Sequence, residues 1–223
     1  MNNIILYISN TNNLNNPEIF KQGYETLIEE RQKKVDEYKF FKDKVLSLGA
    51  GLLLQKALED ENISIEKCQY KYNEHKKPYI IADEKIIHFN LSHSGEYVIC
   101  AISNSEVGCD IEKIETANFK TAKRFFSKNE YEIIMQEENL EKRNGLFYRF
   151  WTLKESFIKA AGIGLSLPLN KFQIILQNEI SIIQNFNKDN YYFTEYNEIS
   201  GYKCAVCSKE FEYKVKTISY TLP

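Results

Sequence analysis

The pattern of apolar and polar residues predicts short strands on both sides of a long helical region in the first part of the chain. An apolar strand is expected over residues 4–8, and a helical turn over residues 17–24. Residues 25–58 have helical periodicity, charged at first and apolar across residues 45–54. A strand at residues 68–72 and strands at residues 88–102 and 107–112 follow, with a turn at Ser94-Gly95.

The second part of the chain repeats this order of helices and strands. Ser127 and Glu130 have the spacing of a capping box, which predicts a helix start. That helix continues to about residue 138, and the polar residues 139–144 are expected to form a loop. A second helix carries an apolar stripe and ends at Gly162, before Pro168. Strands are then expected at residues 173–176, 180–183, 191–194, 202–207 and 213–220.

This order of elements predicts an α+β fold made of two similar halves. The halves are expected to span residues 1–105 and 106–223 and to be related by a pseudo-two-fold axis. Motif residues from both halves would then meet at the seam, a common place for a ligand site.

Composition limits the classes of function. The 223 residues carry a formal net charge of -2 without a long block of one sign, which argues against a nucleic-acid partner. No apolar run approaches the length of a membrane span, and the first residues lack the features of a secretory signal. Cys204 and Cys207 have metal-like spacing, but no second pair completes four ligands. We therefore expect a soluble protein from a reducing, cytoplasmic compartment, and we separately expect a monomer.

Candidate chemistry begins with two acidic residues on one predicted strand. Asp110 and Glu112 are two residues apart, so their carboxylates project from the same face of the strand. Two neighbouring carboxylates repel each other unless a cation neutralises them. Hard oxygen ligands in this arrangement suit Mg²⁺, which binds one or two carboxylates together with substrate phosphates.

A second set of polar residues lies on the later helix. Tyr148, Thr152, Glu155 and Lys159 share one helical face, whereas Lys154 lies close to the apolar stripe. A cation in that place must extend to solvent or pair with another group. Each feature alone has an ordinary interpretation: a solvated strand face, a surface ion pair, or a turn residue in the case of His93. The combination and its order favour a functional site.

These motifs resemble those of the 4'-phosphopantetheinyl transferases, of the surfactin-synthetase-activating (Sfp) type. The resemblance covers roughly residues 25–176. Its motifs occur in the order Lys77-Pro78, residues 90–94, the Gly108-x-Asp-Ile-Glu112 segment, residues 124–127 and the segment from Trp151 to Lys159. The resemblance implies transfer of the phosphopantetheine arm of coenzyme A to a serine of an apo acyl or peptidyl carrier protein, with release of adenosine 3',5'-bisphosphate. Such carriers serve fatty acid, polyketide or nonribosomal peptide synthesis.

The resemblance also implies a role for each site residue. Asp110, Glu112 and Glu155 would hold Mg²⁺, with Mn²⁺ as an alternative. Glu155 would also accept the proton of the carrier serine, and Lys159 would contact the diphosphate. The remaining implied contacts to coenzyme A come from Lys33, Lys77, Ser92, His93 and Lys154.

The chain departs from the family pattern at two places near the expected nucleotide. Glu30 stands where a lysine is expected, and Val45-Leu46 replaces an Arg-Thr pair. Two other functions stay open at the level of sequence: a Mg²⁺-dependent hydrolase of nucleotide-like diphosphates, and a non-catalytic module that binds coenzyme A or a carrier protein. No GxxxxGK[ST] loop is present, which weakens ATP-driven alternatives.

Overall fold

The computed structural model describes residues 4–210 and the backbone of residues 215–219, except for the side chain of Leu165. The chain forms two compact units. The first contains the described residues up to Tyr72, residues 78–104 and strand β11, and the second contains residues 73–77 and those from Ser105 to Glu210. Neither unit is contiguous in sequence, because the 73–77 loop belongs to the second unit and β11 belongs to the first.

The first unit is built on a six-stranded sheet in the order β11-β1-β5-β4-β3-β2. Its strands are β1 (Ile4–Asn10), β2 (Gln69–Tyr72), β3 (Pro78–Ala82), β4 (Lys85–Ser94), β5 (Tyr97–Ser103) and β11 (Val215–Ser219). Strand β11 pairs with β1 in parallel, and the other neighbours are antiparallel. The positions of β1 and β11 confirm the strands expected near residues 4–8 and 213–220, although residues 213, 214 and 220 lie outside the described range.

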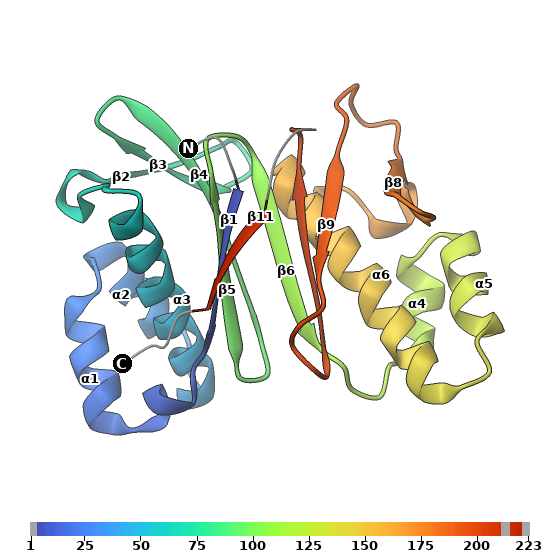
Figure 1. Ribbon diagram of the computed structural model, residues 1–223, viewed down its shortest axis with the longest axis horizontal. Helices are drawn as coiled ribbons and strands as arrows, with labels where there is room; N and C mark the ends of the chain where they lie inside the picture. The colour runs from blue at the N-terminus through green and yellow to red at the C-terminus, as the bar shows by residue number, and fades with distance from the viewer. Residues whose placement is uncertain (1–3, 211–214, 220–223) are drawn as a thin grey trace. The chain divides into compact units, whose positions relative to one another are not determined.

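Helices cover one face of this sheet (Figure 1). They are α1 (Pro17–Thr26), α2 (Glu29–Asp36) and α3 (Phe41–Asp60), with short 3-10 turns η1 (Asn12–Asn15) and η2 (Ile65–Lys67). The helical pattern expected over residues 25–58 is thus divided, because the backbone at Leu27, Ile28 and Phe40 is extended. Helix α3 is buried along most of its length, as its continuous apolar sequence requires.

The second unit contains a three-stranded antiparallel sheet and a separate hairpin. The sheet has the order β6-β10-β9, formed by β6 (Val107–Lys113), β9 (Tyr192–Tyr196) and β10 (Tyr202–Ser208). The hairpin consists of β7 (Gln173–Leu176) and β8 (Ile180–Ile183), as the sequence predicts. Helix α6 (Leu140–Ala161) packs along β6 and β10 and is flanked by α4 (Phe119–Phe125) and α5 (Lys128–Gln136) (Figure 1). The short turns η3 (Gly164–Ser166) and η4 (Leu169–Lys171) follow.

Helix ends in this unit match the capping signals, with one error. Ser127 and Glu130 form the expected capping box at the start of α5, and Gly162 closes α6 in the left-handed conformation with a φ of 69°. The loop expected over residues 139–144 was wrong. The side chain of Asn139 instead accepts a hydrogen bond from the Lys142 amide and caps α6, which starts at Leu140.

Each unit is a sheet covered by helices around its own apolar core, which confirms the α+β fold class. The pseudo-two-fold relation, the boundary at residue 105 and a site at the seam stay predictions. Within residues 4–210 and 215–219, no helix is both long and apolar enough to cross a membrane.

Candidate active site

The centre of the candidate site is an ion pair between the middle of β6 and the last turns of α6. The ammonium of Lys159 lies 2.7 Å from Oδ1 of Asp110 and donates a second hydrogen bond of 3.1 Å to the Cys109 carbonyl. Asp110 is almost fully buried, with 4% of its surface exposed. Two motifs that lie about fifty residues apart in the sequence are therefore joined in the second unit.

Gly108 explains how the helix and the strand come this close. A Cβ atom at this position would lie 2.1 Å from the Ser156 carbonyl oxygen and 2.3 Å from the Ala160 amide nitrogen. Both atoms belong to the backbone of α6, so a side chain could be accommodated only by moving the helix. The glycine of the Gly108-x-Asp-Ile-Glu112 motif is thus required by packing, a role that sequence analysis did not assign.

Glu155 lies in the same electrostatic environment, one turn before Lys159. Burial raises the pKa of its carboxyl group, and the negative charge of Asp110 raises it further, against the smaller opposite effect of Lys159. Burial alone would lower the pKa of Lys159, but the attraction of Asp110 and the neighbouring acceptors outweighs it, so its pKa is raised. Glu155 is therefore a carboxylate with increased basicity beside a firmly protonated lysine.

Glu112 lies two residues beyond Asp110 and is partly exposed. It contributes to a raised pKa of Tyr148, for which burial is the larger cause and Glu115 the second. Glu112 is therefore close enough to Tyr148 to act on it electrostatically. On the polar face of the helix, Lys159 contacts Asp110, and Glu155 lies near the same aspartate. Tyr148, on the same face, lies near Glu112.

The carboxylates fit a magnesium ion by their chemistry. Asp110 is close enough to Glu155 for its negative charge to disfavour ionisation of the Glu155 carboxyl group. A divalent cation relieves such repulsion. Among the described side chains, however, no three His, Cys, Asp or Glu residues converge in a ready metal-binding group. The donor set suits Mg²⁺, while its three carboxylates are not gathered into one cluster.

Lys154, expected as a contact to coenzyme A, has a different role in the structure. Its side chain is fully buried, and its ammonium pairs with Glu130 at 2.8 Å. It also donates hydrogen bonds of 2.9 Å to the carbonyls of Leu169 and Phe172. Burial lowers its pKa to about 8, and Glu130 opposes that effect. The side chain of Lys154 has no exposed surface, and these contacts favour a role in the fold.

Glu130, the partner of Lys154, was assigned only to the capping box by sequence analysis. It has that role, since its Oε2 accepts a hydrogen bond from the Ser127 amide at 2.7 Å. Its Oε1 accepts from the Ile174 amide at 2.7 Å and also meets Lys154. The signal for this pair was present in the sequence as a cation next to an apolar helix stripe.

Lys77, a second expected ligand contact, is held by backbone carbonyls of the second unit. Its ammonium donates to the carbonyls of Val107 at 3.0 Å and Ala160 at 3.1 Å. Burial lowers the pKa of this lysine to about 8, and Glu106 opposes that effect. The neighbouring Asn73 donates a 3.0 Å hydrogen bond to the Gly162 carbonyl. The 73–77 loop is therefore attached to the end of α6.

The remaining expected contacts belong to the first unit. Ser92 and His93 lie on β4, where Ser92 is buried and His93 is half-buried. Lys33 is exposed on α2 and forms a 2.6 Å ion pair with Glu29. Val45 and Leu46, which replace the Arg-Thr pair of the family pattern, are buried on α3 and form part of its core.

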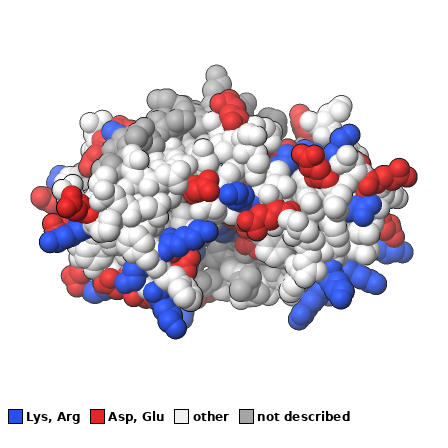
Figure 2. Space-filling view, turned by 90° about the horizontal axis from the view of Figure 1, so that it is seen from below, with Lys and Arg blue, Asp and Glu red and all other residues white. Residues whose placement is uncertain are grey.

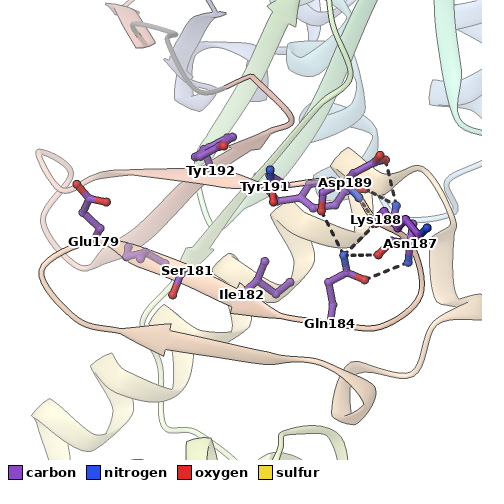
Figure 3. Close-up of a pocket in the computed structure, with 11 residues that line it drawn as sticks. Glu179, Ser181, Ile182, Gln184, Asn187, Lys188, Asp189, Tyr191 and Tyr192 are labelled. Carbon is purple, nitrogen blue, oxygen red and sulfur yellow. Dashed lines mark hydrogen bonds between the residues drawn. The ribbon is translucent and has the colours of Figure 1, made fainter.

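A cavity of about 410 Å³ lies apart from these residues, between β8 and the loop that leads to β9 (Figure 3). Its polar groups largely satisfy one another. The amide nitrogen of Gln184 donates to Asn187 and to the Asp189 carbonyl, and Asn187 in turn donates to the Tyr191 hydroxyl (Figure 3). This network orders the loop, and none of the motif residues lines the cavity.

Charged side chains of both signs are interspersed over the face shown in Figure 2, in keeping with the net charge of -2.

A smaller cavity in the second unit, of about 390 Å³, is lined by the apolar and aromatic groups of Phe126 and Tyr131 and by Lys123 and Lys128. The exposed residues Lys120 and Arg124 lie on the adjoining helix α4.

Comparisons with known proteins agree with this geometry. Residues 106–207 match the model of the 4'-phosphopantetheinyl transferase superfamily, and residues 15–105 match that of the 4'-phosphopantetheinyl transferase N-terminal region. The 4'-phosphopantetheinyl transferase gsp of Aneurinibacillus migulanus is 40% identical over 80% of this chain and 75% of its own length. The 4'-phosphopantetheinyl transferase Sfp of Bacillus subtilis is 36% identical over 76% of this chain and 78% of its own.

The strand motif Asp-x-Glu and the helical motif Lys-Glu-x-x-x-Lys thus occur in a chain whose two parts both match one transferase family. The chain belongs to the 4'-phosphopantetheinyl transferases, and among them to the Sfp type. The resemblance drawn from the motifs is confirmed, and a non-catalytic binding module no longer needs consideration.

Proposed function

We propose that this chain transfers the 4'-phosphopantetheine arm of coenzyme A to a serine of an apo acyl or peptidyl carrier protein and releases adenosine 3',5'-bisphosphate. The observation that carries the proposal is the 2.7 Å pair of Asp110 and Lys159 beside Glu155. These residues stand at the motif positions of a family whose members are named for this transfer. The proposal therefore combines family membership with a site suited to an anionic substrate.

The reaction needs a base and a group that stabilises negative charge. The carrier serine oxygen attacks the phosphorus next to the pantetheine arm, and the bond from that phosphorus to the bridging oxygen breaks. Glu155 accepts the serine proton, a role that its raised pKa favours because a more basic carboxylate accepts protons more readily. Lys159 stabilises the charge that develops on the departing bridging oxygen. Both groups lie on adjacent turns of α6.

Asp110, Glu112 and Glu155 would hold Mg²⁺, or Mn²⁺ in its place. When bound, the ion supplies positive charge that reduces repulsion between the diphosphate and the attacking serine. The effect of the Asp110 charge on Glu155 supports this assignment, since the site concentrates negative charge that needs compensation. Lys159 provides part of that compensation through its contact with Asp110.

Recognition of coenzyme A is proposed to use residues of the first unit as well. His93 and Ser92 would contact the 3'-phosphate, and Lys33 would give a further cationic contact. A 3'-phosphate attracts the protonated imidazole of His93, because an opposite charge favours the charged form. Lys33 is exposed and would have to exchange its partner Glu29 for the phosphate.

The carrier protein is proposed to dock on the second unit near α4. Carrier proteins present an acidic helix, and Lys120, Lys123 and Arg124 offer exposed positive charge on this element. Phe126 and Tyr131 line the adjoining cavity with apolar surface.

We further propose that the protein acts as a monomer in the cytoplasm. All five cysteines lie in the part of the chain that the structure describes and none forms a disulfide, which supports a reducing compartment.

The test is intact mass spectrometry of an apo carrier protein incubated with this protein, coenzyme A and Mg²⁺. The proposal predicts a mass gain of one phosphopantetheine arm, which is lost when a chelator is added. Breakdown of coenzyme A without a mass gain would instead show a hydrolase. If neither occurs with several acyl and peptidyl carriers, the proposed function is wrong.

A further inference from the structure

The 73–77 loop and the end of α6 form a contact that the proposed reaction does not itself use. Within the loop, the Asn73 side-chain oxygen accepts hydrogen bonds from the His75 amide at 2.9 Å and the Lys77 amide at 2.8 Å. The Asn73 amide also donates to the Lys77 carbonyl at 2.9 Å. The loop is thus closed on itself by its own hydrogen bonds.

This closed loop is attached to α6 at two points. The Asn73 side chain donates to the Gly162 carbonyl, the residue that ends the helix. Lys77 donates to the Ala160 carbonyl, which lacks an amide partner within the helix because it lies in the last turn. A positive charge at a helix C-terminus is also favoured by the helix dipole. The loop therefore caps the end of the helix that carries Glu155 and Lys159.

The second hydrogen bond of Lys77 extends this cap to the strand. Its ammonium donates to the Val107 carbonyl, immediately before Gly108. One cation thus joins the strand and the helix where Gly108 allows them to touch, since Gly108 faces the backbone of Ser156 and Ala160. The two residues that Lys77 binds are direct sequence neighbours of Gly108 and Lys159.

We propose that Lys77 is a positioning residue, which sets the place of Lys159 relative to Asp110 by holding α6 against β6. This inference rests on the proposed function. The direct contact of Lys77 with coenzyme A that the family resemblance implies is the alternative, and the experiment below distinguishes the two. The ammonium donates hydrogen bonds to two protein carbonyls, at 3.0 and 3.1 Å. Its removal would leave the Val107 and Ala160 carbonyls without this donor and would loosen the contact next to Lys159.

The positioning role and a direct contact with the phosphate predict different kinetic effects. A positioning residue alters the geometry of the transition state, so its loss lowers kcat more than it weakens binding. A displacement of about 1 Å at a catalytic group can cost up to about a hundredfold in rate. A residue that only binds the phosphate would, when removed, raise KM for coenzyme A and leave kcat largely unchanged.

The experiment compares wild type, Lys77→Met and Lys77→Arg with an apo carrier protein, coenzyme A and Mg²⁺. We expect Lys77→Met to lower kcat by about tenfold or more, with KM for coenzyme A changed less than about threefold. Arginine also donates hydrogen bonds to carbonyls, so Lys77→Arg should recover part of kcat. Lys71→Met is the matched control, because it removes an exposed lysine of the neighbouring strand β2.

A second variant keeps the test decisive if Lys77→Met folds poorly. Asn73→Ala leaves the ammonium in the chain but removes the bond to Gly162 and the closure of the loop, so it should lower kcat in the same direction. A rise in KM for coenzyme A at unchanged kcat in Lys77→Met would overturn the positioning role. Absence of transfer by wild type would instead refute the proposed function, so the two failures are distinguishable.

Discussion

At the scale of residues, Lys154 and Glu155 are sequence neighbours with opposite environments. Lys154 points into the core and binds Glu130, whereas Glu155 lies with Asp110 and Lys159. Adjacent positions on a helix are separated by about 100°, so one can face the core while the other faces the site. The motif Trp-x-x-Lys-Glu-x-x-x-Lys therefore combines a lysine buried in the core with two residues that we propose for the reaction.

The first prediction concerns this buried lysine. Lys154→Met should lower the free energy of unfolding by about 3–5 kcal/mol, because it leaves the Glu130 carboxylate buried without its cation. Chemical denaturation measures this change. The double variant Lys154→Met with Glu130→Gln should recover part of the loss. Unchanged stability together with weaker binding of coenzyme A would return Lys154 to the ligand site.

The second prediction concerns His93. Replacing it with alanine should weaken binding of coenzyme A by about tenfold or more, the value of a hydrogen bond to a charged group. Dephospho-coenzyme A lacks the 3'-phosphate, so its binding should change little. Calorimetric titration with both ligands gives the comparison. An equal loss for both would remove His93 from the phosphate contact.

At the scale of elements, the crossing of β6 and α6 determines the candidate site. The strand supplies Asp110 and Glu112, the helix supplies Glu155 and Lys159, and Gly108 sets how closely they approach. The cap provided by the 73–77 loop lies at the same crossing. Changes at this crossing should therefore affect catalysis even where they touch no ligand.

The third prediction tests this close approach. Gly108→Ala would place a methyl group 2.1 Å from a backbone oxygen of α6, so the helix must move. We expect a loss of about 1–3 kcal/mol in unfolding free energy, typical of overpacking, and a marked fall in kcat. Gly145→Ala is the matched control on α6, because a Cβ atom there meets nothing within 4 Å. A fully active Gly108→Ala variant would refute the packing argument.

The elements of the second unit were largely predictable, and the errors have physical causes. Strands with alternating apolar residues and helices with clear caps, such as that at Ser127, were found because those signals are local. The start of α6 was missed because polar residues 139–144 suit both a loop and an exposed first turn. The roles of Gly108, Lys77 and the Glu130 partner of Lys154 depend on contacts between distant segments, which no local pattern encodes.

At the scale of the whole molecule, the chain consists of two units with separate cores. The two matched family models meet between residues 105 and 106. The order of strands and helices was sufficient to predict two α+β halves. It could not show that the 73–77 loop belongs to the second unit, since that assignment comes from hydrogen bonds spanning more than eighty residues.

The second unit contains the residues proposed for metal binding and catalysis, and the first contains those proposed for the 3'-phosphate. Each group can therefore be tested by variants that alter one unit only. The central claim is that Glu155, assisted by Asp110 and Lys159, makes this chain a carrier-protein phosphopantetheinyl transferase.

The measurement that tests this claim most directly is the rate of mass gain of an apo carrier protein with wild type and with Glu155→Gln, side by side. Glutamine keeps the size of the side chain but can neither accept the serine proton nor supply a carboxylate to Mg²⁺. The account predicts steady addition of one phosphopantetheine arm by wild type and a rate lower by about a hundredfold to ten-thousandfold for Glu155→Gln. Equal rates for the two proteins would contradict it.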